Sequence, residues 1–160
     1  PDAPVNAFLL VVGDGPVRSE LEELAKTLGV ADKFRFTGVV DRNKVPEHVA
    51  AFDIALQPAV TAYASPLKMM EYMVLGKAIV APKEPNLQEI LTDGDNALMF
   101  DGESPNGLEN ALSQLCSQPE LRAKLATGAR SSIQRFNLTW NGNAERVVSL
   151  AEKAICAKRD

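Results

Sequence analysis

The feature that most constrains the fold is a repeated alternation of short apolar runs with helical patterns. The apolar runs cover residues 8–12, 34–36, 54–56, 79–81 and 97–100. Apolar residues at helical spacing follow each run, over residues 17–29, 45–51, 67–75, 87–91 and 108–115. Strands joined through helices run parallel, and a parallel sheet covered on both faces has continuously apolar strands. The sequence therefore predicts an α/β fold with a doubly wound, Rossmann-like parallel sheet of five strands.

The remainder of the chain is helical only, with patterns over residues 121–133 and about 143–157. We expect these helices to pack across the sheet or to reach a partner. Asn137-Leu138-Thr139 matches a glycosylation sequon but is interpreted as the start of the last helix. A length of 160 residues predicts one domain, residues 1–160.

Composition excludes several classes of protein. With 46% hydrophobic and 24% charged residues, the chain is typical of a soluble domain, without a membrane span or a secretion leader. A net charge of −4 with scattered Lys and Arg argues against nucleic-acid binding. Cys116 and Cys156 are expected to be free thiols, which favours a cytoplasmic location.

Ligands of an open parallel sheet bind beyond the carboxyl ends of the strands, so the loops after the strands are candidate sites. The first loop, Gly13-Asp14-Gly15-Pro16, has Arg18 where a dinucleotide fingerprint needs a third glycine. This argues against a nicotinamide cofactor. The glycines fit either a tight strand-to-helix turn or a turn beside a bound nucleotide.

The most informative loop leads through Tyr63 into a helix. Ser65 and Pro66 suit a helix N-terminus, where free amide hydrogens can hold an anion. Lys68 lies in the first turn, where it opposes the helix dipole unless a phosphate lies beside it. Glu71 follows on the same face. The pair fits either a structural ion pair or a polar nucleotide pocket.

Two later loops carry polar residues with ordinary structural interpretations. Asn86 precedes a helical pattern and fits either a helix cap or a ligand contact. Asp93-Gly94-Asp95 has a spacing that can hold a divalent metal, but a turn requires the same residues. We interpret it as a turn and predict no metal site. His48 is the only histidine and has no nucleophile motif to accompany it.

Five sequence blocks occur in the order typical of one enzyme family. They are residues 11–16, 36–40, 52–58, the stretch 71–81 from Glu-Tyr-Met to Ile-Val-Ala, and 89–94. Together they resemble the C-terminal domain of the group 1 (GT4-like) glycosyltransferases, which have the two-domain GT-B architecture. The resemblance covers nearly the whole chain, in a variant with the motif Ser-Pro-x-Lys-x-x-Glu-Tyr-Met.

The resemblance implies roles for several residues. Glu71 falls on the second glutamate of the family signature, which binds the donor ribose, and a carboxylate can accept hydrogen bonds from two hydroxyls. Tyr63 occupies the position of the first glutamate, so the catalytic residue is not assigned. Ser65, Leu67 and Lys68 are the candidates for the donor diphosphate.

Further donor-binding candidates come from the other loops. Gly13 and Gly15 form the first loop, Gly38 and Val39 are expected to edge the base, and Glu89 to shape the pocket. No cofactor is implied beyond a nucleotide-diphosphate sugar as donor substrate.

The chain departs from the family pattern at its beginning. Family C-terminal domains open with a strand and a loop whose Arg and Lys grip the diphosphate, and here that unit is absent. The missing strand is the central one in the order 3-2-1-4-5-6. We therefore predict a gap between the strands at residues 8–12 and 54–56. The acceptor-binding N-terminal domain is also absent, and peripheral membrane association is expected only through that half.

The resemblance implies a retaining transferase that moves a hexose to an acceptor without a metal, by stabilising the leaving diphosphate. This chain would be its donor-binding part, inactive alone. Two alternatives stay open: a nucleotide-sugar epimerase of the same fold, and a non-catalytic binding module suggested by Tyr63. The donor base, the sugar, the acceptor and dimerisation are left open as well.

Overall fold

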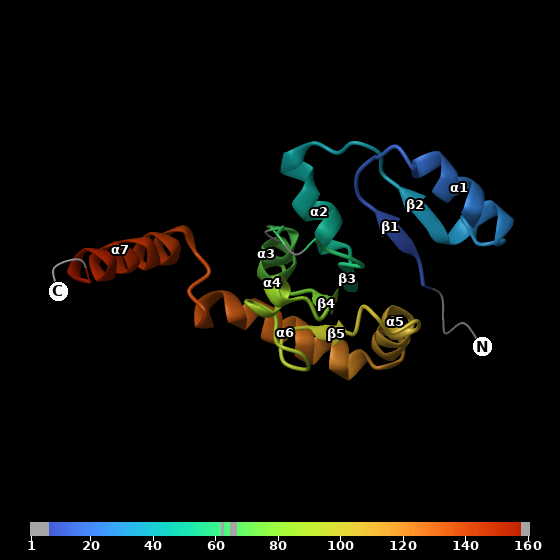
Figure 1. The fold of residues 1–160 in the computed structure, drawn as a ribbon. Helices are drawn as coiled ribbons and strands as arrows, with labels where there is room; N and C mark the ends of the chain where they lie inside the picture. The colour runs from blue at the N-terminus through green and yellow to red at the C-terminus, as the bar shows by residue number, and fades with distance from the viewer. Residues whose placement is uncertain (1–6, 62, 65–66, 158–160) are drawn as a thin grey trace.

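The computed structural model describes residues 7–61, 63–64 and 67–157. Five strands alternate with helices, as predicted (Figure 1). The strands are β1 (Leu9–Val11), β2 (Phe34–Phe36), β3 (Ile54–Leu56), β4 (Ala78–Pro82) and β5 (Leu98–Phe100). The α-helices are α1 (Arg18–Thr27), α2 (Val45–Ala50), α3 (Leu67–Val74), α4 (Pro85–Gln88), α5 (Gly107–Ser117), α6 (Pro119–Arg135) and α7 (Trp140–Cys156). Two short 3-10 helices, η1 (Ala31–Lys33) and η2 (Arg42–Lys44), precede β2 and α2. The α/β fold is therefore confirmed.

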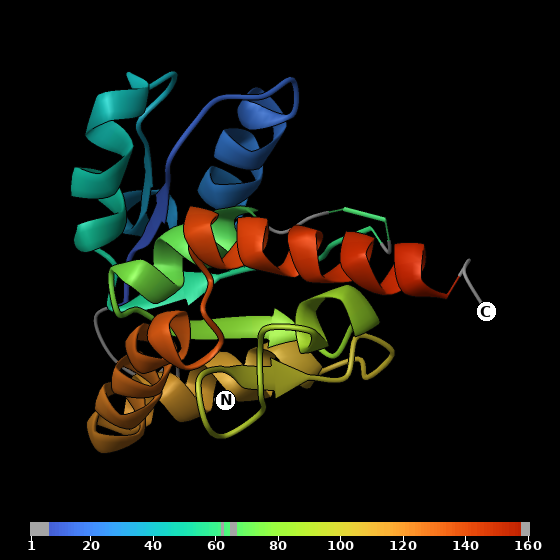
Figure 2. The same ribbon diagram turned by 90° about the vertical axis from the view of Figure 1, so that its left-hand side faces the viewer.

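The strands form two parallel sheets. One has the order β1-β2 and the other the order β3-β4-β5. Within the described residues β1 and β3 are not paired with each other, which confirms the predicted gap between them. In Figures 1 and 2, β1, β2 and α1 form a group beside the three-stranded sheet.

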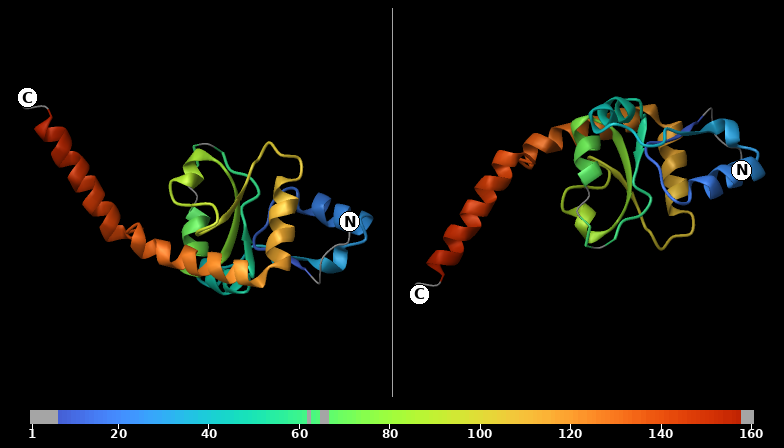
Figure 3. Two further views of the ribbon diagram at one scale, coloured as in Figure 1. Left: turned by 90° about the horizontal axis from the view of Figure 1, so that it is seen from below. Right: turned by 90° about the horizontal axis from the view of Figure 1, so that it is seen from above.

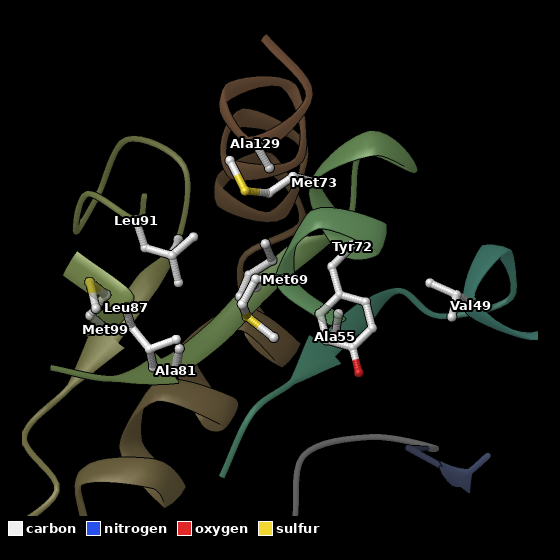
Figure 4. Close-up of a cluster of buried hydrophobic side chains, with 12 residues drawn as sticks. Val49, Ala55, Met69, Tyr72, Met73, Ala81, Leu87, Leu91, Met99 and Ala129 are labelled. Atoms are coloured by element: carbon white, nitrogen blue, oxygen red, sulfur yellow. The ribbon is translucent and has the colours of Figure 1, made fainter. Parts of the chain in front are cut away.

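The three-stranded sheet carries the hydrophobic core on both of its faces. Every residue of β4 is buried, as expected for the central strand of a parallel sheet. Ile79 and Ala81 face a cluster with α3, while Ala78 and Val80 face a cluster with α5. Figure 4 shows the first cluster, in which side chains of α3 lie between β3 and α6. This core fixes the carboxyl edge of the sheet, where the candidate loops begin.

The two C-terminal helices behave differently. Helix α6 packs on α3 and β4, as expected. Helix α7 extends away from the body of the molecule (Figure 3) and makes no extensive contact with another element of the described chain. Thr139 caps α7 by accepting a hydrogen bond of 3.0 Å from the amide of Gly142, which confirms residues 137–139 as a helix start. No helix among the described residues is long and apolar enough to cross a membrane.

Candidate functional site

Helix α3 presents the candidate donor-binding residues on its exposed face. Met69, Tyr72 and Met73 are buried against the sheet, and this anchors the helix. Leu67, Lys68 and Glu71 lie on the exposed side, and Leu67 is 73% exposed. Ser65 lies outside the described residues. The structure thus brings together three of the four candidates around the start of α3.

The predicted alternative of a structural ion pair between Lys68 and Glu71 is not found. Within the described part of the chain neither side chain has an ion pair or a hydrogen bond. A cation in the first turn of a helix is unfavourable without an anion nearby. The arrangement leaves a positive group, a negative group and a helix N-terminus available to a polar ligand.

Tyr72 follows Glu71 on the buried side of α3, and its pKa is shifted. Its ring packs edge to face on Phe52, with ring centroids 6.2 Å apart. Burial raises the pKa of the Tyr72 phenol above its ordinary value, and the charge of Glu71 raises it further. The neutral phenol is therefore favoured in the folded protein, and Tyr72 serves the core rather than the site.

Two side-chain amides hold the loop between β3 and α3. One belongs to Gln57 in this loop, and the other to Asn86 on helix α4. The side chain of Gln57, which is largely buried, donates a short hydrogen bond to the carbonyl of Ala59. Asn86 Nδ2 donates to the carbonyl oxygens of Thr61 at 3.1 Å and Ala64 at 2.8 Å. These two residues were not predicted to hold the loop.

Asn86 is therefore not a helix cap. Helix α4 begins at Pro85, and its capping position is Glu84, which makes no side-chain cap. The alternative of capping fails because Asn86 lies inside the first turn of the helix, where its side chain reaches the neighbouring loop. The signal in the sequence was the run of polar residues directly after strand β4. This run did not specify which backbone carbonyls the Asn86 side chain would contact.

Tyr63 lies in the held loop and is 91% exposed. The amide of Ala64 donates to the carbonyl of Thr61 at 3.0 Å, which closes a turn around this residue. An aromatic ring thus projects into solvent at the position that the sequence resemblance matches with an acid.

The loops after β1 and β2 form a second group of candidates. Gly13 and Gly38 face each other in an isolated bridge, with φ of 130° and 70°. The Gly13 amide also donates to Thr37 Oγ1 at 3.1 Å. A positive φ favours glycine, so the tight-turn interpretation of the first loop explains Gly13, and the same backbone conformation accounts for a glycine at position 38. Gly15 is exposed beside them, and Val39 is 87% exposed.

Arg18, at the start of α1, is engaged by protein groups. Its Nε lies 2.8 Å from Glu22 Oε1, and its Nη1 lies 3.6 Å from Asp14 Oδ2. The guanidinium carbon also lies over the Phe36 ring, 5.6 Å from the ring centroid. The hydrogen bond that Arg18 donates to the Glu22 carboxylate raises the pKa of Arg18 above its ordinary value. The first loop is thereby a structural junction between α1 and β2.

The two groups of candidates belong to different sheets. Gly13, Gly15, Gly38 and Val39 follow β1 and β2, whereas Leu67, Lys68 and Glu71 follow β3. Glu89 is exposed at the end of α4.

The Asp93-Gly94-Asp95 segment is a turn with protein partners. Asp93 accepts a hydrogen bond of 2.9 Å from the amide of Met99 and forms an ion pair of 3.0 Å with Lys83. Asp95 pairs with Arg135. No cluster of three or more metal-ligating side chains occurs in the described residues.

Two concavities of the described surface lie away from the candidate loops. One of 290 Å³ is lined by Asp53, Lys77 and Arg122, and an adjoining one of 450 Å³ by Arg130 and Ser131 among others. Asp53 and Lys77 precede strands β3 and β4, so these depressions lie at the amino ends of the strands. The candidate loops lie at the opposite edge.

Comparisons with known proteins assign the chain to a family. Residues 3–132 match the family described as "Glycosyl transferases group 1". The D-inositol 3-phosphate glycosyltransferase of Acidothermus cellulolyticus is 28% identical over 96% of this chain and 35% of its own length. The lipopolysaccharide core biosynthesis glycosyltransferase LpsD of Rhizobium meliloti is 31% identical over 82% of the chain and 38% of its own length. The chain thus spans little more than a third of these relatives.

Solved structures agree on the fold. Anabaena Alr3699/HepE, crystallised in complex with UDP, superimposes with a TM-score of 0.78 at 22% identity, covering 93% of this chain and 42% of its own. The C-terminal domain of a group 1 glycosyltransferase, LpcC from Francisella tularensis, gives 0.66 at 26% identity, covering 74% and 60%. This chain belongs to the group 1 glycosyltransferase family.

Proposed function

We propose that this chain is the truncated, C-terminal donor-binding domain of a GT-B glycosyltransferase that transfers a hexose from a nucleotide-diphosphate sugar to an acceptor with retention. The observation that carries the proposal is the exposed face of α3. There Lys68 lies in the first turn and Glu71 follows on the same face, and among the described residues neither side chain has an ion pair or a hydrogen bond. Family membership and the UDP bound by Anabaena Alr3699/HepE support a nucleotide sugar as the ligand.

Each group on α3 suits one part of the donor. The carboxylate of Glu71 can accept hydrogen bonds from both ribose hydroxyls, and charge strengthens such bonds. The ammonium of Lys68, the amides of the first turn of α3 and the positive end of the helix dipole suit the diphosphate. Gly38, Val39 and Glu89 would border the base and the sugar.

Catalysis in this proposal depends on the leaving group. Breaking the bond between the sugar and the diphosphate leaves negative charge on the phosphate oxygens. Fixed positive charge and helix N-termini stabilise that charge as it develops, so a metal is not required.

The open edges of the fold support a partner domain. Strands β1 and β3 each lack a neighbour on one side within the described residues, which accommodates the proposed central strand. Exposed apolar side chains on α7, including Trp140 at 90%, Val147 and Ile155, offer a surface for the acceptor domain. The chain alone would then be inactive.

A non-catalytic nucleotide-sugar-binding module is the second candidate. The observation that favours it is Tyr63, because a phenol at the tip of the loop cannot replace the charge of the family's first glutamate.

The test is a titration of the full-length protein with UDP-, GDP- and ADP-sugars. Glu71→Gln should weaken binding of the preferred donor about tenfold, since one charge-assisted hydrogen bond is lost. Glu109→Gln, an exposed change on α5, is the matched control. Absence of binding to every nucleotide sugar contradicts the proposal. Donor binding without transfer to water or an acceptor supports the module instead.

A further inference from the structure

The turn that carries Tyr63 has no regular secondary structure to hold it. It lies in the loop between β3 and α3, and among its described residues a local hydrogen bond from the Ala64 amide to the Thr61 carbonyl closes it. The additional hydrogen bonds to its carbonyls come from Asn86, which is 25 residues from Thr61 and 22 from Ala64. The position of the turn therefore depends on a contact between distant parts of the chain.

Both the nitrogen and the oxygen of the Asn86 side-chain amide are hydrogen-bonded to backbone groups. Both carbonyls accept from Nδ2, at 3.1 Å and 2.8 Å, while Oδ1 accepts from the amide of Leu87 at 3.1 Å. An amide nitrogen has two hydrogens, and the two carbonyls take both of them. Asn86 is thereby left without a donor for a ligand, so its contribution is to hold the loop.

The anchor of this contact is rigid. Leu87, the next residue, is fully buried in the core cluster with α3 and β4. Pro85 opens helix α4 and fixes the backbone just before Asn86. A side chain on such a segment can hold the loop at a fixed position relative to the hydrophobic core.

We propose that Asn86 is a positioning residue that fastens Thr61 and Ala64, and so sets where Tyr63 projects in the loop that precedes α3. The effect on the donor rests on the proposed function, because Lys68 and Glu71 follow on that helix. The fastening itself does not, since it depends only on the hydrogen bonds.

The test uses chymotrypsin, which cleaves after the exposed Tyr63, on the full-length protein under native conditions without ligand. Asn86→Asp keeps the size of the side chain but replaces the two donated hydrogens with an oxygen that faces two carbonyls. Asn86→Ala removes the amide altogether. Gln88→Ala, an exposed change on the same short helix, is the matched control.

We expect cleavage after Tyr63, followed by mass spectrometry, to be about tenfold faster in both Asn86 variants and unchanged in the control. Urea unfolding of the same variants separates local from global opening. Unchanged cleavage at Tyr63, or an increase fully explained by lower global stability, overturns the proposal.

Donor titration completes the test. Where the unaltered protein binds a nucleotide sugar, Asn86→Asp should raise its Kd about tenfold, and faster cleavage with an unchanged Kd overturns the positioning role. Where the unaltered protein binds no nucleotide sugar, the proposed function fails, and cleavage alone decides whether Asn86 fastens the turn.

Discussion

Replacing Asn96 by Ala should be among the most destabilising single changes in this chain. Asn96 is fully buried and makes three hydrogen bonds. Its Oδ1 accepts from the amide of Thr92 at 2.6 Å, and its Nδ2 donates to the carbonyl of Ile90 and to Ser132 Oγ, both at 3.0 Å. The Ser132 hydroxyl in turn donates to the carbonyl of Gly128 at 2.8 Å. Asn96 thus ties the turn before β5 to helix α6.

The cost follows from the groups left behind. Alanine removes the partner of the partly buried Thr92 amide, the partly buried Ile90 carbonyl and the buried Ser132 hydroxyl, and each net hydrogen bond contributes about 1 kcal/mol. The small cavity left by the fully buried side chain adds to the loss, so we expect a decrease of about 2–4 kcal/mol in the free energy of unfolding. For a chain of this length that corresponds to a fall in Tm of roughly 5–15 °C.

The assay is urea unfolding followed by circular dichroism, with Asn110→Ala on the exposed face of α5 as control. A double-mutant cycle with Ser132→Ala isolates the bond between Asn96 and Ser132. Because that bond is already absent in Asn96→Ala, the second change should cost less there than in the unaltered chain, by about 0.5–1.5 kcal/mol. A loss below about 1 kcal/mol for Asn96→Ala, or strictly additive costs in the cycle, would refute the reasoning.

Two further predictions concern close packing and acidity. Gly128→Ala would place a Cβ atom 2.0 Å from the backbone oxygen of Asp95. This substitution should therefore lower the free energy of unfolding, measured with urea, by more than about 2 kcal/mol. Gly102→Ala, whose Cβ meets its neighbours only at 3.9 Å or beyond, should cost less than half as much. The raised pKa of Tyr72 means that the unfolded chain loses this proton first, so the stability contribution is present below about pH 10 and is lost as the pH rises further. An ultraviolet titration of Tyr63→Phe, which leaves Tyr72 as the only tyrosine, should give a midpoint above about 10, and a midpoint at or below that value contradicts the assignment.

The strands could be predicted because burial on both faces demands apolar residues at every position. Residues 79–81 form such a run, and the structure extends it by one residue at each end into the fully buried β4. The order of the strands around the gap was predictable from the doubly wound pattern once β1 and β3 were recognised as its second and fourth strands. Both inferences rest on properties that short segments carry by themselves.

The side-chain contacts of the site could not be predicted in the same way. Asn86 has equally good local reasons to cap a helix, and only the fold brings Thr61 and Ala64 within reach of its amide. Lys68 and Glu71 have the spacing of a helical ion pair, yet the structure leaves them apart. Spacing permits such a pair, and in water a pair of this kind is too weak to be certain to form.

The strands that border the gap between β1 and β3 are less buried than the central strand β4. No residue of β1 or β2 is buried, although both are as apolar as β4 at most positions, whereas all of β4 is buried. In β3, Ala55 is buried and its neighbours Ile54 and Leu56 only partly so. A strand between β1 and β3 would cover these edges and supply the neighbour that a parallel sheet requires on each side. The carboxyl end of that proposed strand would then lie beside the end of β3, so its loop would approach the start of α3 and the unpaired Lys68.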